Sequence, residues 1–289
     1  MWLALAFLSA FLLGFYDVSK KYSLRNNAVI PILFLNTLFC SLIFLPLAFR
    51  TPFGGWEVQR YILLKACIVL SSWLLGYIGI KNLPITIVGP INATRPVMVL
   101  VGALIIFGER LNLMQWAGVL LAIFSFFLLS RSGKKEGIDF KHNRWILCTV
   151  GAAILGAISG LYDKYLMATE SGLGLPRLTV QCWYNFYQCI MMGAMLLLLW
   201  WPKRKESTPF KWRWNILLIS VFLSVADYVY FYSLSLDGAL ISVVSMVRRS
   251  SVLVSFMLGA LLFHEKNLRS KAIDLALVLL SMLLLWLGQ

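Results

Sequence analysis

The stretch from Pro84 to Gly108 constrains the fold of this chain most strongly. It has 25 residues, and Arg95 is the only one with a formal charge. At about 1.5 Å per residue, an apolar helix of this length crosses the roughly 30 Å hydrocarbon core of a bilayer and places Arg95 near the midplane. A guanidinium at that depth costs at least about 2.5 kcal/mol to insert. We therefore expect Arg95 to face a partner or a water-filled cavity.

A second run repeats this arrangement later in the chain. Between Gly238 and Phe263 the only charges are Arg248 and Arg249, and a shift of 154 residues lays Arg95 on Arg249. We predict that these two helices form the centre of the molecule and that the arginines face one central cavity.

Composition agrees with a protein that lies mostly inside a membrane. Sixty per cent of the residues are hydrophobic, 13% are charged, and the mean hydropathy is +0.82. The apolar segments are long and continuous rather than alternating, which indicates helices and not a barrel. Ten such segments are predicted: Trp2–Asp17, Val29–Phe49, Tyr61–Ile80, Pro84–Phe107, Leu113–Leu129, Trp145–Asp163, Leu178–Trp201, Trp214–Leu236, Ala239–Phe263 and Ile273–Leu287. The first lacks a basic leader and a cleavage site, so we expect a retained helix.

These segments correspond in order as two sets of five. Residues 1–133 form the first repeat, 134–144 a basic polar linker, and 145–289 the second repeat. Five helices per repeat is an odd number, so the second repeat must cross the bilayer in the opposite sense. The expected fold class is thus all-α integral membrane, with ten transmembrane helices in two inverted repeats and a substrate site at their interface.

The net charge of +14 does not indicate nucleic acid here. Most of the 26 Lys and Arg residues lie at helix ends, where basic residues set topology and meet lipid head groups. The five cysteines fall inside helices, and neither they nor the two histidines show the spacing of metal ligands. No metal, cofactor or nucleic-acid partner is expected, and the partners are the bilayer and a substrate. The expected location is the cell (plasma or inner) membrane, as a multi-pass protein.

Acidic residues recur at matched places near the ends of the first and sixth segments. The sequence Gly-x-Tyr-Asp holds Tyr16 and Asp17 in the first copy and Tyr162 and Asp163 in the second. One interpretation is structural, with Asp17 paired to a lysine three or four residues later. The other is that both carboxylates serve the transport path, carrying a coupled proton or neutralising arginines, while the tyrosines contact substrate.

Amide side chains mark the second and seventh segments. Asn36 lies on an otherwise apolar face, and three amides follow an i, i+4, i+7 pattern along the seventh segment: Gln181, Asn185 and Gln188. They either form hydrogen bonds between helices, worth about 1 kcal/mol or less each, or line a substrate pocket.

The eighth segment carries an acid about midway along its length. Asp227 precedes Tyr228 and Tyr230, and an acid inside a membrane helix is a functional-site candidate. We expect it to pair with one of the three buried arginines, and the tyrosines to contact substrate. Lys65, near the start of the third segment, and Lys81, at its end, are both able to extend towards the interface.

Several motifs resemble the EamA family of the drug/metabolite transporter superfamily. They are Leu83-Pro84, the buried Pro96, Phe107-Gly108-Glu109-Arg110, Gln115-x-x-Gly118 and, in the second copy, Phe263-His264-Glu265-Lys266. The resemblance implies ten helices around a central cavity that is walled by helices 1–4 and 6–9 and opens alternately to either side. It implies no enzymatic activity, and the family's substrates span amino acids, metabolites and toxic compounds.

The arginine pair also resembles phosphate-translocating and nucleotide-sugar relatives. Some of these place adjacent basic residues where Arg248 and Arg249 stand, although often as Lys-Arg. A forked guanidinium can contact two oxygens of a phosphate or carboxylate at once.

Two indicators of orientation disagree. Loops after odd-numbered helices hold 17 basic residues, and those after even-numbered helices, with the helix starts that follow them, hold six. The positive-inside rule then places both termini outside, whereas the resemblance implies both inside.

The leading functional hypothesis is a secondary transporter of a small, anionic metabolite bearing phosphate or carboxylate. No ATP-binding Gly-x-x-x-x-Gly-Lys-Ser/Thr loop is present. The alternatives are a flippase for a lipid-linked phosphate or sugar, and an exporter of amino acids or drugs. A membrane-embedded head-group transferase is disfavoured because acids and histidines do not cluster. The fifth and tenth helices are expected at the periphery, facing lipid or a second copy of the chain.

Overall fold

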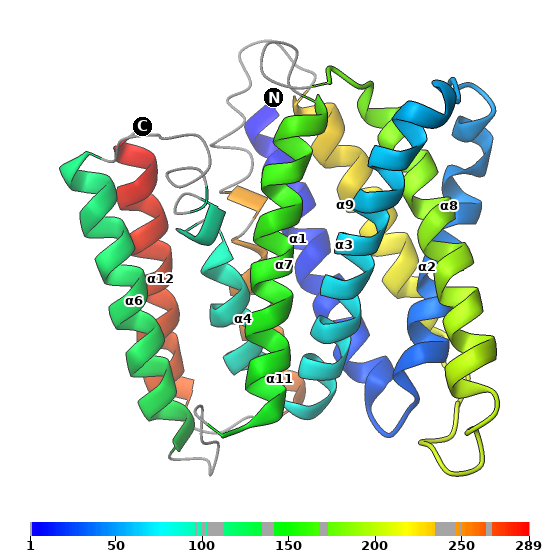
Figure 1. Cartoon of the computed structure of the whole chain (residues 1–289). Helices are drawn as coiled ribbons and strands as arrows, with labels where there is room; N and C mark the ends of the chain where they lie inside the picture. The colour runs from blue at the N-terminus through cyan, green and yellow to red at the C-terminus, as the bar shows by residue number, and fades with distance from the viewer. Residues whose placement is uncertain are drawn as a thin grey trace.

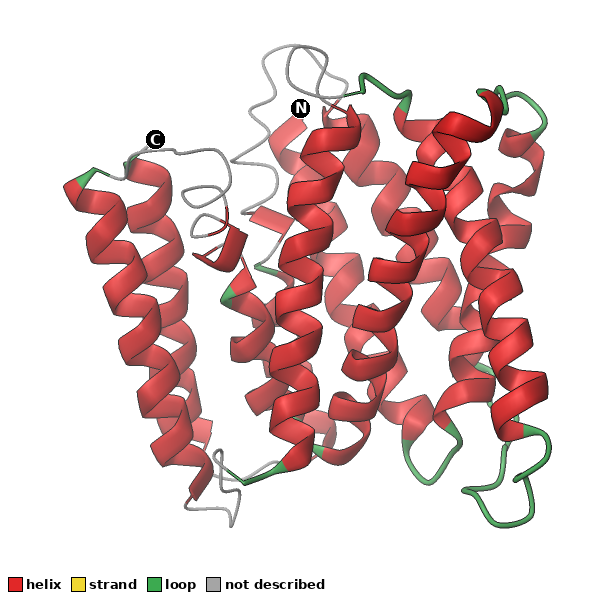
Figure 2. Cartoon of the chain, in the orientation of Figure 1, coloured by secondary structure: helices red, strands yellow, loops and turns green. Residues whose placement is uncertain are grey.

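The structure, a computed structural model, is a bundle of helices (Figure 1). It describes residues 2–95, 97–99, 102, 112–134, 142–167, 173–234, 247–248, 250–263 and 268–288. Within these ranges the regular secondary structure is helical, without strands (Figure 2). The helices are α1 (Trp2–Leu24), α2 (Val29–Ala48), α3 (Gly55–Asn82), α4 (Ile85–Ala93), α6 (Leu113–Lys134), α7 (Arg144–Met167), α8 (Arg177–Met195) with the π-helical turn η1 (Leu196–Trp200), α9 (Asn215–Leu234), α11 (Ser251–Phe263) and α12 (Leu268–Leu287).

The helices have the length and apolarity that a bilayer demands. Four of them contain spans that are long and apolar enough to cross a membrane, with mean hydropathy from 1.3 to 2.2: Val29–Ala48, Gly55–Asn82, Arg144–Asp163 and Leu178–Trp200. Large apolar side chains also cover the outside of the bundle, such as Leu120 and Ile190, which are 62% and 67% exposed. Lipid rather than water satisfies such a surface.

The two halves of the sequence are interleaved in space. α1 packs against α9 and α3 against α7, while α2 packs against α8 and α4 against α11. α6 and α12 pack together at one edge of the bundle (Figure 1), as expected for the fifth and tenth helices. Both chain termini lie at the same end of the bundle.

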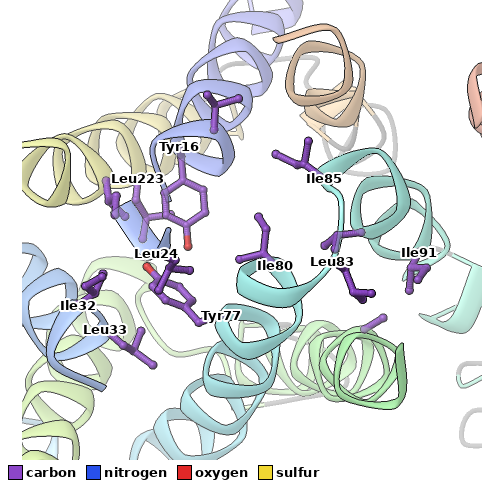
Figure 3. Close-up of a cluster of buried hydrophobic side chains, with 14 of the residues drawn as sticks. Tyr16, Leu24, Ile32, Leu33, Tyr77, Ile80, Leu83, Ile85, Ile91 and Leu223 are labelled. Carbon is purple, nitrogen blue, oxygen red and sulfur yellow. The ribbon is translucent and has the colours of Figure 1, made fainter. Parts of the chain in front are cut away.

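A buried apolar cluster holds the middle of the bundle together. It joins α1, α2, α3, α4 and α9, and Leu24, Leu33, Ile80 and Ile91 are each at most 2% exposed within it. Two phenol rings, Tyr16 of α1 and Tyr77 of α3, lie in the same cluster (Figure 3). The core is therefore apolar with polar groups set into it.

The prediction of one continuous helix after Pro84 was wrong. α4 ends at Ala93, and Thr94 forms a turn immediately before Arg95. The residue after Arg95 is a proline, which lacks the N–H that would bond the carbonyl of Asn92 four residues back, whereas Arg95 itself is helical again. The hydroxyl of Thr94 also donates to the carbonyl of Ile91, 2.7 Å away, which competes with the helical ladder.

A similar break precedes α11 in the second half. Ser250 lies in a turn, and its hydroxyl donates to the carbonyl of Val247 at 2.6 Å, again three residues back. The described helix resumes at Ser251. Both breaks therefore fall beside the arginines at the centre of the two long apolar runs.

The first helix also extends further than predicted. It continues past Asp17 to Leu24, so that acid lies inside a helix and not at its end. The continuation is stabilised from outside, because Nζ of Lys21 donates to the carbonyls of Ile80 and Leu83 at the end of α3.

Close packing of α4 on α11 depends on a glycine. A methyl group on Gly259 would overlap Cγ2 of Ile85, which is buried and branched at Cβ. We expect Gly259→Ala to lower the free energy of unfolding by about 1–3 kcal/mol through overpacking. Gly76→Ala is the matched control, since its added methyl would lie 3.7 Å from the nearest atom, an ordinary contact. Thermal unfolding of the purified variants in detergent measures the difference, and equal melting temperatures would contradict this packing.

Candidate functional site

The first acid of the repeated motif pairs within its own helix. Asp17 accepts a 2.7 Å salt bridge from Nζ of Lys20, three residues later. The ammonium also lies 4.3 Å from the ring centroid of Tyr16 and 5.3 Å from that of Tyr77. The pairing of Asp17 with a nearby lysine is thus confirmed, but the pair is buried among aromatic rings and not frayed into solvent.

The second acid of the motif pairs between helices. Asp163 of α7 forms a salt bridge with Lys65 of α3, whose side chain is only 6% exposed. The ammonium of Lys65 lies 5.0 Å from the ring centroid of Tyr184 on α8. Lys65 could have extended to the interface, but here it lies inside the bundle, paired with Asp163. The Tyr162 hydroxyl donates to the carbonyl of Tyr61 at 3.2 Å.

The acid of α9 pairs with a buried arginine, as predicted. Asp227 forms a salt bridge with Arg248, and their side chains are 13% and 22% exposed. The guanidinium of Arg248 also lies 4.2 Å from the ring centroid of Tyr230. Each of these three acids therefore already holds a cation from the protein. Arg249 lies outside the described residues.

Arg95 is arranged differently from the other buried cations described above. It donates to Oδ1 of Asn92 at 3.1 Å, and its Nε is buried without a hydrogen-bond partner. In the part of the chain that the structure describes, Arg95 makes no ion pair. Its position just after the C-terminus of α4 is favourable for a cation. Arg95 thus carries a positive charge that no carboxylate among the described residues pairs with.

A glycine of α7 makes room for this guanidinium. A Cβ on Gly156 would lie 2.8 Å from Cζ and from Nη1 of Arg95. Any side chain at this position would push the guanidinium away, so Gly156 sets where Arg95 can lie. Sequence reasoning did not find this residue, since a glycine in an apolar helix carries no signal without knowledge of its neighbour.

The amide of α2 belongs to a polar ladder between α2 and α9. Ser220 donates to Oδ1 of Asn36 at 3.0 Å, and one turn further along Ser224 donates to Sγ of Cys40 at 3.7 Å. Nδ2 of Asn36 is buried without a partner. The interpretation of Asn36 as an interhelical hydrogen-bonding residue is supported, and the amide nitrogen remains available.

The amides of α8 are buried and partly unpartnered. Gln181, Asn185 and Gln188 are between 0% and 4% exposed. Nδ2 of Asn185 and both polar side-chain atoms of Gln188 have no hydrogen-bond partner among the described residues. Buried amides without partners are costly, so this stripe is suited to contact a polar ligand.

Several of these groups lie within electrostatic reach of one another. Tyr16 interacts with Asp17, Cys40 and Asp227, and Tyr184 interacts with Asp163, Asp227 and Cys40. Arg95 interacts with Asp17 and Tyr16. We call this set the central polar cluster; its members are Tyr16, Asp17, Cys40, Arg95, Asp163, Tyr184 and Asp227.

Tyr228 lies away from this cluster. It is 57% exposed on the outside of α9, next to Ile43 and Leu47 of α2. Two further residues complete the surroundings of Asp17: Lys20 and Tyr77. The i, i+3 spacing to Asp17 had predicted the pairing with Lys20, whereas a tyrosine in an apolar helix gave no signal for Tyr77.

Comparisons with known proteins agree with this architecture. The model of the EamA-like transporter family matches residues 1–131 and 143–287. An "Uncharacterized transporter" of Archaeoglobus fulgidus is 28% identical over 129 residues, which span 42% of this chain and 45% of that protein. A solved crystal structure of a protein with 14% identity superposes with a TM-score of 0.65, over 99% of this chain and 97% of its own. That structure shows the similarity of the fold alone.

Removing the acid of the buried pair should destabilise the protein. Asp227→Leu leaves Arg248 unpaired in a low-dielectric site, and we expect a loss of about 3 kcal/mol in the free energy of unfolding. The double variant Asp227→Leu with Arg248→Met removes both charges and should recover most of this loss. Thermal or denaturant unfolding in detergent provides the measurement.

The exposed pair of Glu57 and Arg60 is the control for this experiment. Its side chains are 87% and 64% exposed and lie 3.9 Å apart, so Glu57→Gln should change stability by less than about 1 kcal/mol. A double variant as unstable as Asp227→Leu alone would show that the pair is not the source of the effect.

Proposed function

The chain belongs to the EamA-like transporter family and is a membrane transporter, and we propose that it moves a small anionic metabolite by alternating access. The observation that carries this proposal is Arg95, a half-buried residue whose Nε is buried without a partner and whose guanidinium pairs with no carboxylate among the described residues. An anion would relieve its uncompensated charge in a low-dielectric site. A carboxylate or a phosphate fits the fork of a guanidinium best.

Pairing among the other charges supports giving this role to Arg95. Asp17, Asp163 and Asp227 hold Lys20, Lys65 and Arg248, respectively. Arg248 is thereby largely neutralised, so the first contact with substrate falls to Arg95. The unpartnered amides of Asn36, Asn185 and Gln188 would then bind neutral polar groups of the same molecule.

Alternating access requires two halves of opposite orientation, and the helix contacts support this. In the two repeats α1 is equivalent to α7, α2 to α8, α3 to α9 and α4 to α11. The contact of α1 with α9 is matched by the equivalent contact of α7 with α3. Likewise, α1 with α11 is matched by α7 with α4, and α2 with α9 by α8 with α3. α1 begins at the upper end in Figure 1 and α7 at the lower end. These matching contacts support the proposal of an inverted repeat of ten helices.

Two glycines of the repeated motif follow the same exchange. A Cβ on Gly14 of α1 would overlap Val254 of α11, and a Cβ on Gly160 of α7 would lie 3.7 Å from Val99, beyond α4. The repeated motif therefore places equivalent helices beside each other in the two halves.

The proposed location of the protein is the cell membrane.

The acids of the repeated motif lie towards opposite ends of the bundle. Asp17 is near the lower end of α1 and Asp163 near the upper end of α7. Each holds a lysine beside tyrosine rings. We propose that, as the site opens to one side and then to the other, each acid either binds and releases a proton or releases and rebinds its lysine partner.

The anion site is tested by a thermal-shift screen against anionic, zwitterionic and cationic metabolites. We expect anions to raise the melting temperature of the parent protein. Arg95→Lys keeps the charge but loses the two-pronged contact, so it should weaken the response to the same anion about tenfold. Arg95→Gln should abolish it.

Neighbouring glycines of α7 provide a matched pair for the same screen. Gly156→Ala should weaken anion binding as Arg95→Lys does, because the methyl group displaces the guanidinium. Gly160→Ala, one turn further along, adds a methyl at an ordinary contact distance of 3.7 Å and should bind as the parent does. Parent-like responses in all the Arg95 and Gly156 variants, with normal expression, would reject the anion site.

The role of the paired acids is tested by uptake into proteoliposomes across a range of pH. If Asp17 or Asp163 carries a coupled proton, Asn at that position cannot titrate, so transport by the variant should depend less on pH than transport by the parent. Profiles of Asp17→Asn and Asp163→Asn that both overlay the parent profile would leave the two acids with a structural role only.

A further inference from the structure

A lateral groove opens between α2 and α9 on the outside of the bundle. Its volume is about 380 Å³, and its walls are mostly apolar: Ile43, Phe44 and Leu47 on α2, and Val221, Val225 and Tyr228 on α9. Ile43, Val225 and Tyr228 are 43%, 44% and 57% exposed. In a membrane-spanning bundle this face meets lipid.

The groove lies beside the hydrogen bonds that join the two helices. α2 and α9 run in the same direction, since Ser220 bonds Asn36 and Ser224 bonds Cys40 with the same separation of 184 residues. The groove starts at the level of these bonds, with Val221 and Ser224, and continues along both helices to Leu47 and Tyr228. The hydroxyl of Ser224 lies at its floor and already has a partner in Cys40. The floor therefore presents no unmet polar group, which suits a hydrocarbon chain.

A basic residue stands at the end of the groove nearest the membrane surface. Ile43, Leu47 and Arg50 follow an i, i+4, i+7 pattern, and the N–H of Arg50 bonds the carbonyl of Leu47 at 3.0 Å, so the same face continues through the turn. Arg50 is exposed, and its side chain forms no ion pair or hydrogen bond within the ranges that the structure covers. Across the groove, Tyr232 lies one turn beyond Tyr228 and is 45% exposed. Exposed tyrosines and a free arginine are typical of the head-group level of a bilayer.

We propose that this groove is a binding site for a membrane phospholipid. One acyl chain lies between α2 and α9, against Ile43, Leu47 and Val225, and the phosphate contacts the guanidinium of Arg50. The seven steps along the chain from Ile43 to Arg50 span roughly 10 Å of helix, so the site holds the part of the acyl chain nearest the head group. The lipid fills the space that the helices leave and stabilises their seam.

The site borders the central polar cluster through a single layer of side chains. Ser224 faces the groove, and Cys40, its hydrogen-bond partner, interacts with Asp227. The proposal does not depend on the anion site. Its failure would leave the role of Arg95 untouched, and failure of the anion site would leave the lipid site intact.

The experiment uses delipidated full-length protein in detergent, titrated with dioleoyl phosphatidylglycerol. Native mass spectrometry counts bound lipid, and thermal unfolding measures stabilisation. We expect the parent to bind and to be stabilised. Val225→Trp fills the groove from α9 and should weaken binding at least tenfold. Ile43→Trp fills it from α2 and serves as the second variant if the first does not fold. Ile190→Trp, on the exposed face of α8, is the control and should bind as the parent does.

The head-group contact is tested separately with a lipid that lacks the phosphate. Arg50→Gln should weaken binding of phosphatidylglycerol about threefold, as expected for one exposed charge contact, and leave binding of dioleoylglycerol unchanged. Parent-like binding of phosphatidylglycerol by both tryptophan variants would overturn the acyl-chain site. An equal loss of both lipids in Arg50→Gln would overturn the assignment of the phosphate to this arginine.

Discussion

The cost of burying charge in a low-dielectric interior governs the arrangement of this protein. A membrane-spanning helix can keep an ionised side chain only if another group compensates it. Asp17, Asp163 and Asp227 each hold a cation of the same chain. Aromatic rings flank these cations, with ring centroids 4.2–5.3 Å away, and add cation–π attraction. Against this background, the charge of Arg95 stands out because no described carboxylate pairs with it.

Breaks in the central helices determine what the arginines can reach. A continuous helix would satisfy its own backbone and present the arginine at a fixed angle. At Thr94 and Ser250 a hydroxyl bonds the carbonyl three residues back, and the chain turns beside the arginines. Arg95 thereby lies against the bare backbone of Gly156 on α7. Discontinuous helices near the midplane are a recurrent way to build transporter sites, and here they combine with a glycine that leaves room for the guanidinium.

Interleaving of the two halves connects the centre of the bundle with both ends. α3 belongs to the first half and carries Lys65, whose partner Asp163 lies on α7 of the second half. α11 belongs to the second half and packs against α1 and α4 of the first. A movement of one half against the other must therefore rearrange this salt bridge and the packing of α11 against α1 and α4. The seam between α2 and α9 is held by hydrogen bonds and has no salt bridge among the described residues. It is there that the groove opens to the lipid.

The sequence by itself determined the class of the protein, its helical segments and the positions of its buried charges, because hydropathy and helix length depend on local composition alone. It also predicted that Asp227 would hold an arginine, since a lone acid at that depth has few other solutions. The sequence did not determine which arginine pairs with Asp227. It also did not determine that Lys65 lies inside the bundle or that Tyr228 lies on its outside. Those outcomes depend on which face of each helix meets which neighbour, and small differences in rotation decide this. Only the tertiary structure showed that, of the two described central arginines, Arg248 pairs with a carboxylate and Arg95 does not, lying instead against Gly156.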